Sequence, residues 1–175
     1  IVGNEQAFLI GVRLLTGIIS ADQAGPAYTL LAECLVEAMQ NAVEQEFNAL
    51  HGTVKGGGAA IVAMGKLGGR EMTAASDLDL IVVYDAAPDA AQSSGPKELR
   101  IGQYYARLTQ RVIRSLTSPT GEGFLYEVDL RLRPYGNQGP VATRLESFIN
   151  YKKSDAWTWE HMALTRARVI TGPPA

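Results

Sequence analysis

Two aspartates one residue apart offer the clearest chemistry in this 175-residue sequence. Asp77 and Asp79 open an apolar run that reads Asp-Leu-Asp-Leu-Ile-Val-Val-Tyr. In a strand, side chains at positions i and i+2 project from the same face, so both carboxylates would lie together while Leu78 and Leu80 point into a core. Like charges held side by side repel unless a cation lies between them. Because Mg²⁺ is held by one or two carboxylates plus substrate phosphates, the pair predicts a magnesium site.

A glycine-rich turn, Gly65-Lys-Leu-Gly-Gly, lies just before the aspartate pair and follows a short apolar run. Several known glycine and aspartate motifs do not fit it. A Walker A loop would need a glycine where Ala60 stands and Ser or Thr where Leu67 stands. The sequence has no G-x-G-x-x-G, and Ile81 breaks the pattern of a calcium loop. No His or Cys residues have zinc-site spacing.

Composition limits the class of protein. With 46% hydrophobic and 19% charged residues the chain is expected to be globular rather than disordered. Sixteen basic against eighteen acidic residues leave a net charge of −2, which gives no bulk electrostatic case for nucleic acid or an anionic membrane. The single cysteine, Cys34, cannot form an internal disulfide and fits a reducing cytoplasm. The chain begins at Ile1 and ends in Thr-Gly-Pro-Pro-Ala, so we expect a piece of a larger protein.

The hydrophobic pattern predicts helices and strands in a mixed order. Residues 1–54 are expected to form a helical segment, with Pro26 in the first turn of its second helix. Residues 55–175 are expected to form a sheet with further helices. The helices are predicted over 5–19, 28–50, 97–117, 147–153 and 156–168, and the strands over 59–64, 78–84 and 124–133.

Apolar positions at helical spacing also predict which side chains are buried. In the first helix these are Phe8, Leu9, Val12, Leu15 and Ile19. In the last helix they are Trp159, Met162 and Ala163.

The predicted strand over 124–133 adds a second set of charged side chains. Its alternation places Val128, Leu130 and Leu132 on one face and Glu127, Asp129, Arg131 and Arg133 on the other. The arginines could pair with phosphate or balance the acidic residues.

A glycine turn followed by Asp-apolar-Asp-apolar resembles the signature of the polymerase-beta-type nucleotidyltransferases. The resemblance implies an α+β fold with a small mixed, twisted sheet, helices before it and helices flanking it. In that family the turn approaches the nucleotide phosphates and two strand aspartates hold Mg²⁺. A third carboxylate comes from a later strand, and Asp129 is the matching position. Lys66 stands where the family usually has Ser or Gly.

Longer segments narrow the resemblance. Gly65-Lys-Leu-Gly-Gly-Arg-Glu, Ser76-Asp-Leu-Asp-Leu and Tyr126-Glu-Val-Asp-Leu-Arg-Leu-Arg-Pro are similar to the glutamine synthetase adenylyltransferase family. In that family two homologous units share one chain: the C-terminal unit adenylylates a tyrosine of glutamine synthetase and the N-terminal unit removes the AMP. The segment beginning at Ala156, Ala-Trp-Thr-Trp-Glu-His-Met-Ala-Leu-Thr-Arg-Ala-Arg, resembles the adenylylating unit more closely.

The resemblance implies a two-metal reaction with ATP as substrate and Mg²⁺ as cofactor. Asp77, Asp79 and Asp129 would bind the metal, with Asp129 completing a second metal site or taking the tyrosine proton. The expected phosphate or nucleotide contacts are Gly65, Lys66, Ser76, Arg131 and Arg133, although Lys66 could be solvated and Ser76 could cap the turn.

The resemblance also implies partners, and alternative functions stay open. Glutamine synthetase is the implied protein substrate, and a PII-type regulatory protein would act through the full-length chain. The first alternative is the deadenylylating unit, which would use the same aspartates for phosphorolysis. A second alternative, a nucleic-acid nucleotidyltransferase, would need a basic groove, which the net charge of −2 does not favour. A nucleotide-sensing module without catalysis is the remaining alternative.

Overall fold

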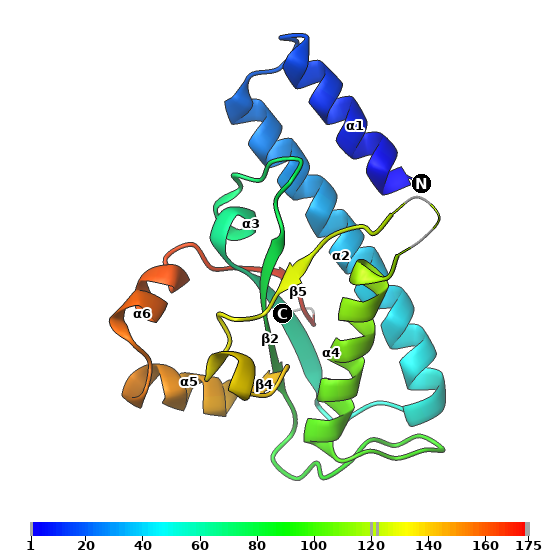
Figure 1. The fold of residues 1–175 in the computed structure, drawn as a ribbon. Coiled ribbons are helices and arrows are strands. Elements are labelled where there is room, and N and C mark those ends of the chain that lie inside the picture. Colours follow the sequence, from blue (N-terminus) through cyan, green and yellow to red (C-terminus); the bar gives the residue numbers. More distant parts are fainter. Residues whose placement is uncertain (1, 120, 122, 174–175) are drawn as a thin grey trace.

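The structure is a computed structural model that describes residues 2–119, 121 and 123–173. Two helices lead into a small sheet that is surrounded by shorter elements (Figure 1). The helices are α1 (Val2–Leu15), α2 (Ala21–His51), α3 (Gly65–Gly69), α4 (Ile101–Thr117), α5 (Leu145–Ser154) and α6 (Thr158–Leu164), with a 3-10 turn at Gly136–Gln138. The strands are β1 (Gly58–Ala63), β2 (Leu78–Asp85), β3 (Val128–Asp129), β4 (Thr143–Arg144) and β5 (Arg168–Thr171).

The sheet is mixed, as predicted. Its main order is β3-β2-β1-β5, and β4 also pairs with β2. Strand β1 is antiparallel to both β2 and β5, whereas β3 and β4 run parallel to β2. The longest strand, β2, therefore lies between β1 on one side and β3 and β4 on the other, which makes it the centre of the sheet.

Alternation along β2 divides the core into two parts. Leu78, Leu80 and Val82 belong to the larger cluster, which includes side chains from α2 and α4. Ile81 and Val83 face the other way and pack with side chains of α5 and of the segment around α6. Helices thus cover both faces of the strand (Figure 1). The prediction that Leu78 and Leu80 point into a core is confirmed, since they are 0% and 2% exposed.

Helix α2 begins earlier than the sequence pattern predicted. Ser20 is the N-cap, and its backbone N–H donates to the Gln23 side chain at 2.9 Å. The connector before α2 therefore ends at Ser20, and Pro26 lies within the helix instead of in its first turn. Pro26 is the sixth residue of the helix, beyond the first-turn positions whose N–H groups have no helical partner, so it removes one backbone hydrogen bond from the helix.

The buried face of α1 also differs from the prediction. Phe8 and Leu15 are 70% and 88% exposed, and Leu9 and Val12 are exposed as well. The helix side chains that pack against the core are instead Ala7, Ile10 and Leu14. Of the predicted set, Ile19, which lies after the helix, does pack there. Apolar residues occur around most of this helix, so spacing alone could not decide which side meets α2.

The C-terminal half of the chain departs most from the predicted elements. The strand expected over 124–133 is reduced to β3, and a series of turns follows it. The helix expected over 156–168 ends at Leu164, and β5 follows. Trp159 and Met162 are exposed, and Ala163 alone of the predicted set joins a core cluster.

A buried polar contact joins α5 to α6. Glu160 is 5% exposed and accepts hydrogen bonds from the Tyr151 hydroxyl at 2.8 Å and from Lys152 Nζ at 2.7 Å. Because a buried carboxylate is costly without partners, these contacts fix the two helices relative to each other. Both helices lie on the side of β2 that carries Asp79 and Ile81.

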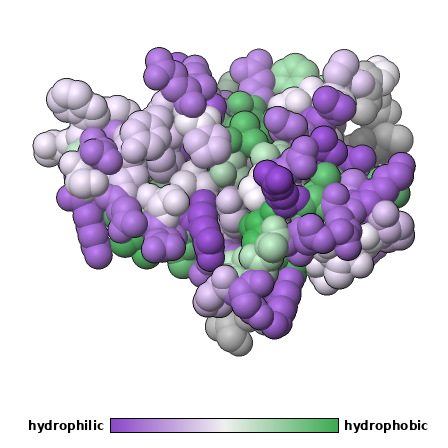
Figure 2. Space-filling view, turned by 90° about the horizontal axis from the view of Figure 1, so that it is seen from below, coloured by the Kyte–Doolittle hydropathy of each residue, from purple (hydrophilic) through white to green (hydrophobic). Residues whose placement is uncertain are grey.

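Hydrophilic side chains dominate the lower face of the molecule. Figure 2 shows hydrophobic groups there only in separate patches between polar ones. Within the described ranges, no helix has both the length and the apolar character needed to cross a membrane.

Two adjacent leucines of α1 test which of its faces is packed. We expect Leu14→Ala to lower the free energy of unfolding by about 1–2 kcal/mol, because its side chain packs against the core. Leu15→Ala should change it by less than about 0.5 kcal/mol, because Leu15 is exposed. Urea denaturation of both variants measures the difference, and equal losses would contradict the described packing.

Candidate active site

Three aspartate side chains converge where β2 and β3 run side by side. The parallel register pairs Asp79 with Asp129 and Leu78 with Val128. Just before β2, Asp77 extends the set, and the Leu78 N–H donates to the Glu127 carbonyl at 2.9 Å. One carboxylate oxygen from each of Asp77, Asp79 and Asp129 lies within 4.8 Å of the others. The structure therefore brings together the three aspartates that the sequence singled out.

The surroundings shift the pKa values of Asp79 and Asp129 in opposite directions. Burial raises the pKa of the Asp79 carboxyl above its ordinary value, and the charges of Asp77 and Asp129 raise it further. Arg131 instead lowers the pKa of Asp129, mainly through its side-chain hydrogen bond. Its Nε donates to Asp129 Oδ2 at 2.7 Å, and its backbone N–H donates to Oδ1 at 2.8 Å. Asp129 thus receives hydrogen bonds from Arg131 that stabilise its ionised form, whereas the pKa of Asp79 stays raised.

The residues fit a hard divalent cation. Carboxylate oxygens are the ligands that Mg²⁺ prefers, and the three here are close enough to share one ion or a pair of ions. Burial first, and then repulsion from Asp77 and Asp129, raises the pKa of Asp79, so its ionised form is unfavourable here without a cation. A cation between the carboxylates would relieve that repulsion.

The glycine turn forms a one-turn helix, α3, that packs directly against Asp79. Gly65 has φ +51°, and a Cβ atom there would lie 2.2 Å from Asp79 Oδ2. The Met64 N–H also donates to the Asp79 carbonyl at 2.9 Å. Only glycine allows both this backbone conformation and this close approach. The turn and the acidic strand are therefore one unit.

The predicted contacts near the turn divide into two groups. Lys66 is exposed, and its charge opposes the rise in the pKa of Asp79, so it lies within electrostatic reach of the acidic residues. Ser76 is buried, and its hydroxyl oxygen accepts a hydrogen bond from the Thr73 N–H at 2.9 Å and lies 3.0 Å from Thr73 Oγ1. Ser76 thus closes the loop before β2, in line with the capping role considered above.

The two arginines after β3 do not share one face, because the chain turns there. Arg131 is exposed and pairs with Asp129. Arg133 points back into its own loop, where Nη1 donates to the Leu130 carbonyl at 2.8 Å and Nε to the Gly139 carbonyl at 3.3 Å. In this structure Arg131 balances the acidic cluster, and Arg133 shapes the loop.

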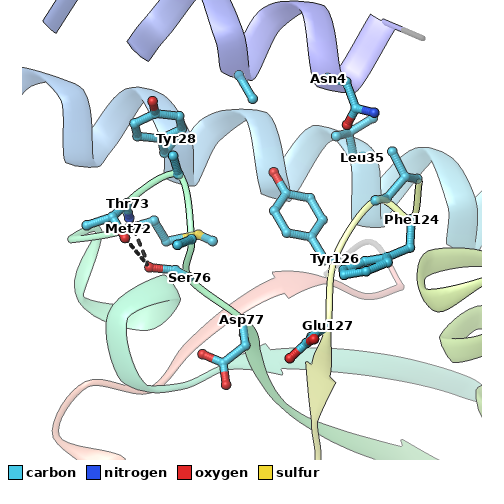
Figure 3. A pocket seen from close by; sticks show the side chains of 15 residues that line it. Asn4, Tyr28, Leu35, Met72, Thr73, Ser76, Asp77, Phe124, Tyr126 and Glu127 are labelled. Carbon is cyan, nitrogen blue, oxygen red and sulfur yellow. Dashed lines mark hydrogen bonds between the residues drawn. The ribbon is translucent and has the colours of Figure 1, made fainter. Parts of the chain in front are cut away.

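A cavity of about 390 Å³ adjoins Asp77. It lies between the segment before β2 and the segment before β3, with α1 and α2 on its far side (Figure 3). Asp77 and Glu127 lie at one end, and mostly apolar or aromatic side chains line the rest, namely Tyr28, Leu35, Met72, Phe124 and Tyr126. Its size falls in the range of small-molecule sites. Of this lining, Ser76 and Asp77 were predicted as site residues.

Residues after α6 also reach the turn without having been predicted to do so. Arg166 pairs with Glu71, and Arg168 donates to carbonyls of α3. These contacts span about 100 residues of sequence, so no local spacing could reveal them.

Gly65→Ala tests the contact between α3 and Asp79. The positive φ and the short approach to the carboxylate should cost at least about 1 kcal/mol of folding free energy. The matched control is Gly102→Ala in α4, where the nearest atom to an added Cβ is 3.7 Å away. That change should be neutral or stabilising by up to about 1 kcal/mol. Urea denaturation of both variants measures their free energies of unfolding, and equal values would contradict the close approach of Gly65 to Asp79.

Asp79→Asn tests the charge repulsion without metal. Because the pKa of Asp79 is raised in the folded chain, its ionised form destabilises the fold relative to the unfolded chain. We expect the variant to unfold at higher urea concentration than the original chain at pH 7. The gain should shrink as pH falls through the folded pKa and vanish below the unfolded value of 3.8, where the carboxyl is protonated in both states.

Magnesium should reverse this order. A ligand that binds only the folded state at 100 times its Kd adds about 2.7 kcal/mol of stability. The original chain should gain stability with Mg²⁺ while Asp79→Asn gains much less. Asp89→Asn is the control, since Asp89 is exposed and pairs with Lys55. Equal stabilisation of all three proteins would contradict a metal site at Asp79.

Known proteins with similar sequences match this chain over all or nearly all of its length. A bifunctional glutamine synthetase adenylyltransferase/adenylyl-removing enzyme of Brucella suis biovar 1 is 58% identical over 175 residues, which is 100% of this chain. Proteins of the same name from Xanthobacter autotrophicus and Mesorhizobium japonicum are 57% and 55% identical over 172 residues, or 98% of this chain.

These relatives are much longer than the chain. It spans 18% of the Brucella protein and 17% of the other two. The sequence model of the family described as glutamate-ammonia ligase adenylyltransferase matches residues 2–175. The acidic cluster and glycine turn thus lie in a matched region that includes every described residue, and the chain belongs to the glutamate-ammonia ligase adenylyltransferase family.

Proposed function

We propose that this chain carries the unit that transfers AMP from ATP to a tyrosine hydroxyl of glutamine synthetase, with Mg²⁺ as cofactor. The observation that supports it most is the convergence of Asp77, Asp79 and Asp129 beside a glycine turn, in a member of an adenylyltransferase family. We further propose that the mixed sheet is of the polymerase-beta type. The parallel β2–β3 pair, which aligns Asp79 with Asp129, supports that assignment.

In this proposal Asp77, Asp79 and Asp129 hold the metal. When bound, Mg²⁺ would neutralise triphosphate charge and favour departure of pyrophosphate. The tyrosine oxygen forms a bond to the α-phosphorus of ATP while the bond from the α-phosphorus to the oxygen that bridges it to the β-phosphorus breaks. Pyrophosphate leaves with that electron pair, and the phenolic proton passes to solvent water. Arg131 keeps Asp129 ionised, which suits a metal ligand better than a strong base.

The residues around the cluster would position the nucleotide. Gly65 and Lys66 are proposed to contact phosphate, the first through its backbone and the second through its charge. Ser76 would act by closing the loop before Asp77, since its hydroxyl already contacts Thr73. The arginines have different proposed roles: Arg131 lies next to the phosphates, and Arg133 supports the loop from which Arg131 projects.

Several features favour transfer of AMP over its removal and over the nucleic-acid alternative. The segment from Ala156 to Arg168 resembles the adenylylating unit of the family. The net charge of −2 offers no bulk attraction for nucleic acid. The cavity beside Asp77 is large enough to take part of one substrate.

In the full-length protein we propose a cytoplasmic enzyme that a PII-type protein regulates. Residues 1–54 would form a helical segment of the domain, and residues 55–175 would form its catalytic segment.

Transfer of labelled AMP from ATP to glutamine synthetase tests the proposal. The full-length protein should label glutamine synthetase only with Mg²⁺, and Asp79→Asn should reduce the rate at least about 100-fold. Asp89→Asn should keep the original rate, because Asp89 lies on an exposed loop and pairs with Lys55. A second assay measures phosphate-dependent release of AMP from adenylylated glutamine synthetase. Loss of release but not of transfer in an Asp79→Asn variant would assign these aspartates to the deadenylylating reaction.

A further inference from the structure

Helix α3 needs support from outside its own sequence. It has only five residues, Gly65–Gly69, and three of them are glycines. Helices this short are not stable alone, and glycine loses more backbone freedom on folding than any other residue. Among the described residues just past its end, only the Arg70 and Glu71 backbone N–H groups cap it, by donating to the Leu67 and Lys66 carbonyls. Some other part of the chain must therefore hold α3 in place.

Arg168 supplies much of that support. Its Nη2 donates to the Leu67 carbonyl at 3.0 Å, and its Nε donates to the Gly68 carbonyl at 3.3 Å. The same Nη2 pairs with the carboxylate of Glu33 on α2. The planar guanidinium thus joins α3 and α2 to β5 through donors on two of its nitrogen atoms, a fixed geometry that the single ammonium nitrogen of a lysine cannot reproduce. Its side chain is only 26% exposed, so water competes little for these contacts.

The backbone around Arg168 also seats α3 closely. Strand β5 places Arg168 opposite Ala63, the last residue of β1, from which the chain continues into α3. A Cβ atom on Gly68 would lie 1.9 Å from the Arg166 carbonyl oxygen. The segment carrying Arg168 therefore lies directly against α3, and Leu67 is fully buried beside it.

The opposite end of α3 touches the acidic cluster. Gly65 lies against the Asp79 carboxylate, and Lys66 follows it. Because α3 is a single turn, any shift at Leu67 and Gly68 also moves Gly65 and Lys66. A displacement of about 1 Å in a catalytic arrangement can cost on the order of 100-fold in rate.

We propose that Arg168 is a positioning residue for the nucleotide, which holds α3 so that Gly65 and Lys66 stay aligned with Asp79. This inference rests on the proposed function, because it takes α3 as the phosphate-binding turn. Arg168 does not touch the nucleotide in this proposal. It acts through the Leu67 and Gly68 carbonyls, and Glu33 orients its guanidinium.

The test compares Arg168→Gln and Arg168→Lys with Arg107→Gln in the full-length protein. Arg107 is the control arginine, because it is exposed on α4 and belongs neither to the glycine turn nor to the acidic cluster. We expect Arg168→Gln to raise the KM for Mg·ATP about tenfold while the KM for glutamine synthetase stays the same. Arg168→Lys keeps the charge but not the planar fork, so its KM for Mg·ATP should also rise, by at least about threefold. Arg107→Gln should leave both constants unchanged.

A purely structural role predicts a different pattern. It would lower the fraction of active protein, and so kcat, without separating the two KM values. Calorimetric titration with a non-hydrolysable Mg·ATP analogue gives the nucleotide affinity without turnover. If Arg168→Gln does not fold, Arg168→Lys carries the same test.

The outcomes separate this inference from the proposed function. Unchanged affinity for the Mg·ATP analogue in the Arg168 variants, or an equal loss in Arg107→Gln, overturns the positioning role even if AMP transfer occurs. If the original protein binds the analogue but transfers no AMP to glutamine synthetase, the proposed function fails. The analogue affinity of the variants then still decides the role of Arg168.

Discussion

The repulsion among Asp77, Asp79 and Asp129 is the constraint on which the site depends. Their carboxylate oxygens lie within 4.8 Å of one another because the parallel register of β2 and β3 aligns Asp79 with Asp129. Arg131 offsets part of this charge at Asp129, while the pKa of Asp79 stays raised by burial and by its two neighbours. An arrangement that is unfavourable by itself is suited to a divalent cation, and the rest of the fold keeps it together.

Three sets of contacts hold the acidic strand, β2, in place. Leu78 and Leu80 anchor β2 in the core shared with α2 and α4, and Ile81 packs toward α5 and α6. The buried contact of Glu160 with Lys152 and Tyr151 fixes α5 to α6 on that second face. The short helix α3 then lies against Asp79 at Gly65. The site is therefore rigid at its strand, and it relies on contacts distant in sequence for its glycine turn.

Local patterns predicted the central elements well and the peripheral ones less well. Alternation along 78–84 correctly separated core leucines from Asp79, because strand geometry leaves only two faces. The first helix was placed with the wrong face inward, since Phe8 and Leu15 have the same character as Ile10 and Leu14 but no neighbour to cover them here. The strand over 124–133 was overextended because alternation persists in its sequence after pairing with β2 has ended at Asp129.

The sequence by itself determined the chemistry: two aspartates at strand spacing, a glycine turn before them and a third aspartate that the family resemblance supplied. The aspartate pair and the turn depend on residue types and short spacings, and Asp129 on a longer sequence likeness, all of which the chain carries without reference to its fold. Only the tertiary structure decided that Arg131 pairs with Asp129 while Arg133 turns into its loop, and that a cavity adjoins Asp77. It also decided that Arg168 reaches α3 from about 100 residues away. Such contacts arise from β-strand pairing and helix packing between distant segments, and no local pattern encodes which segments will meet.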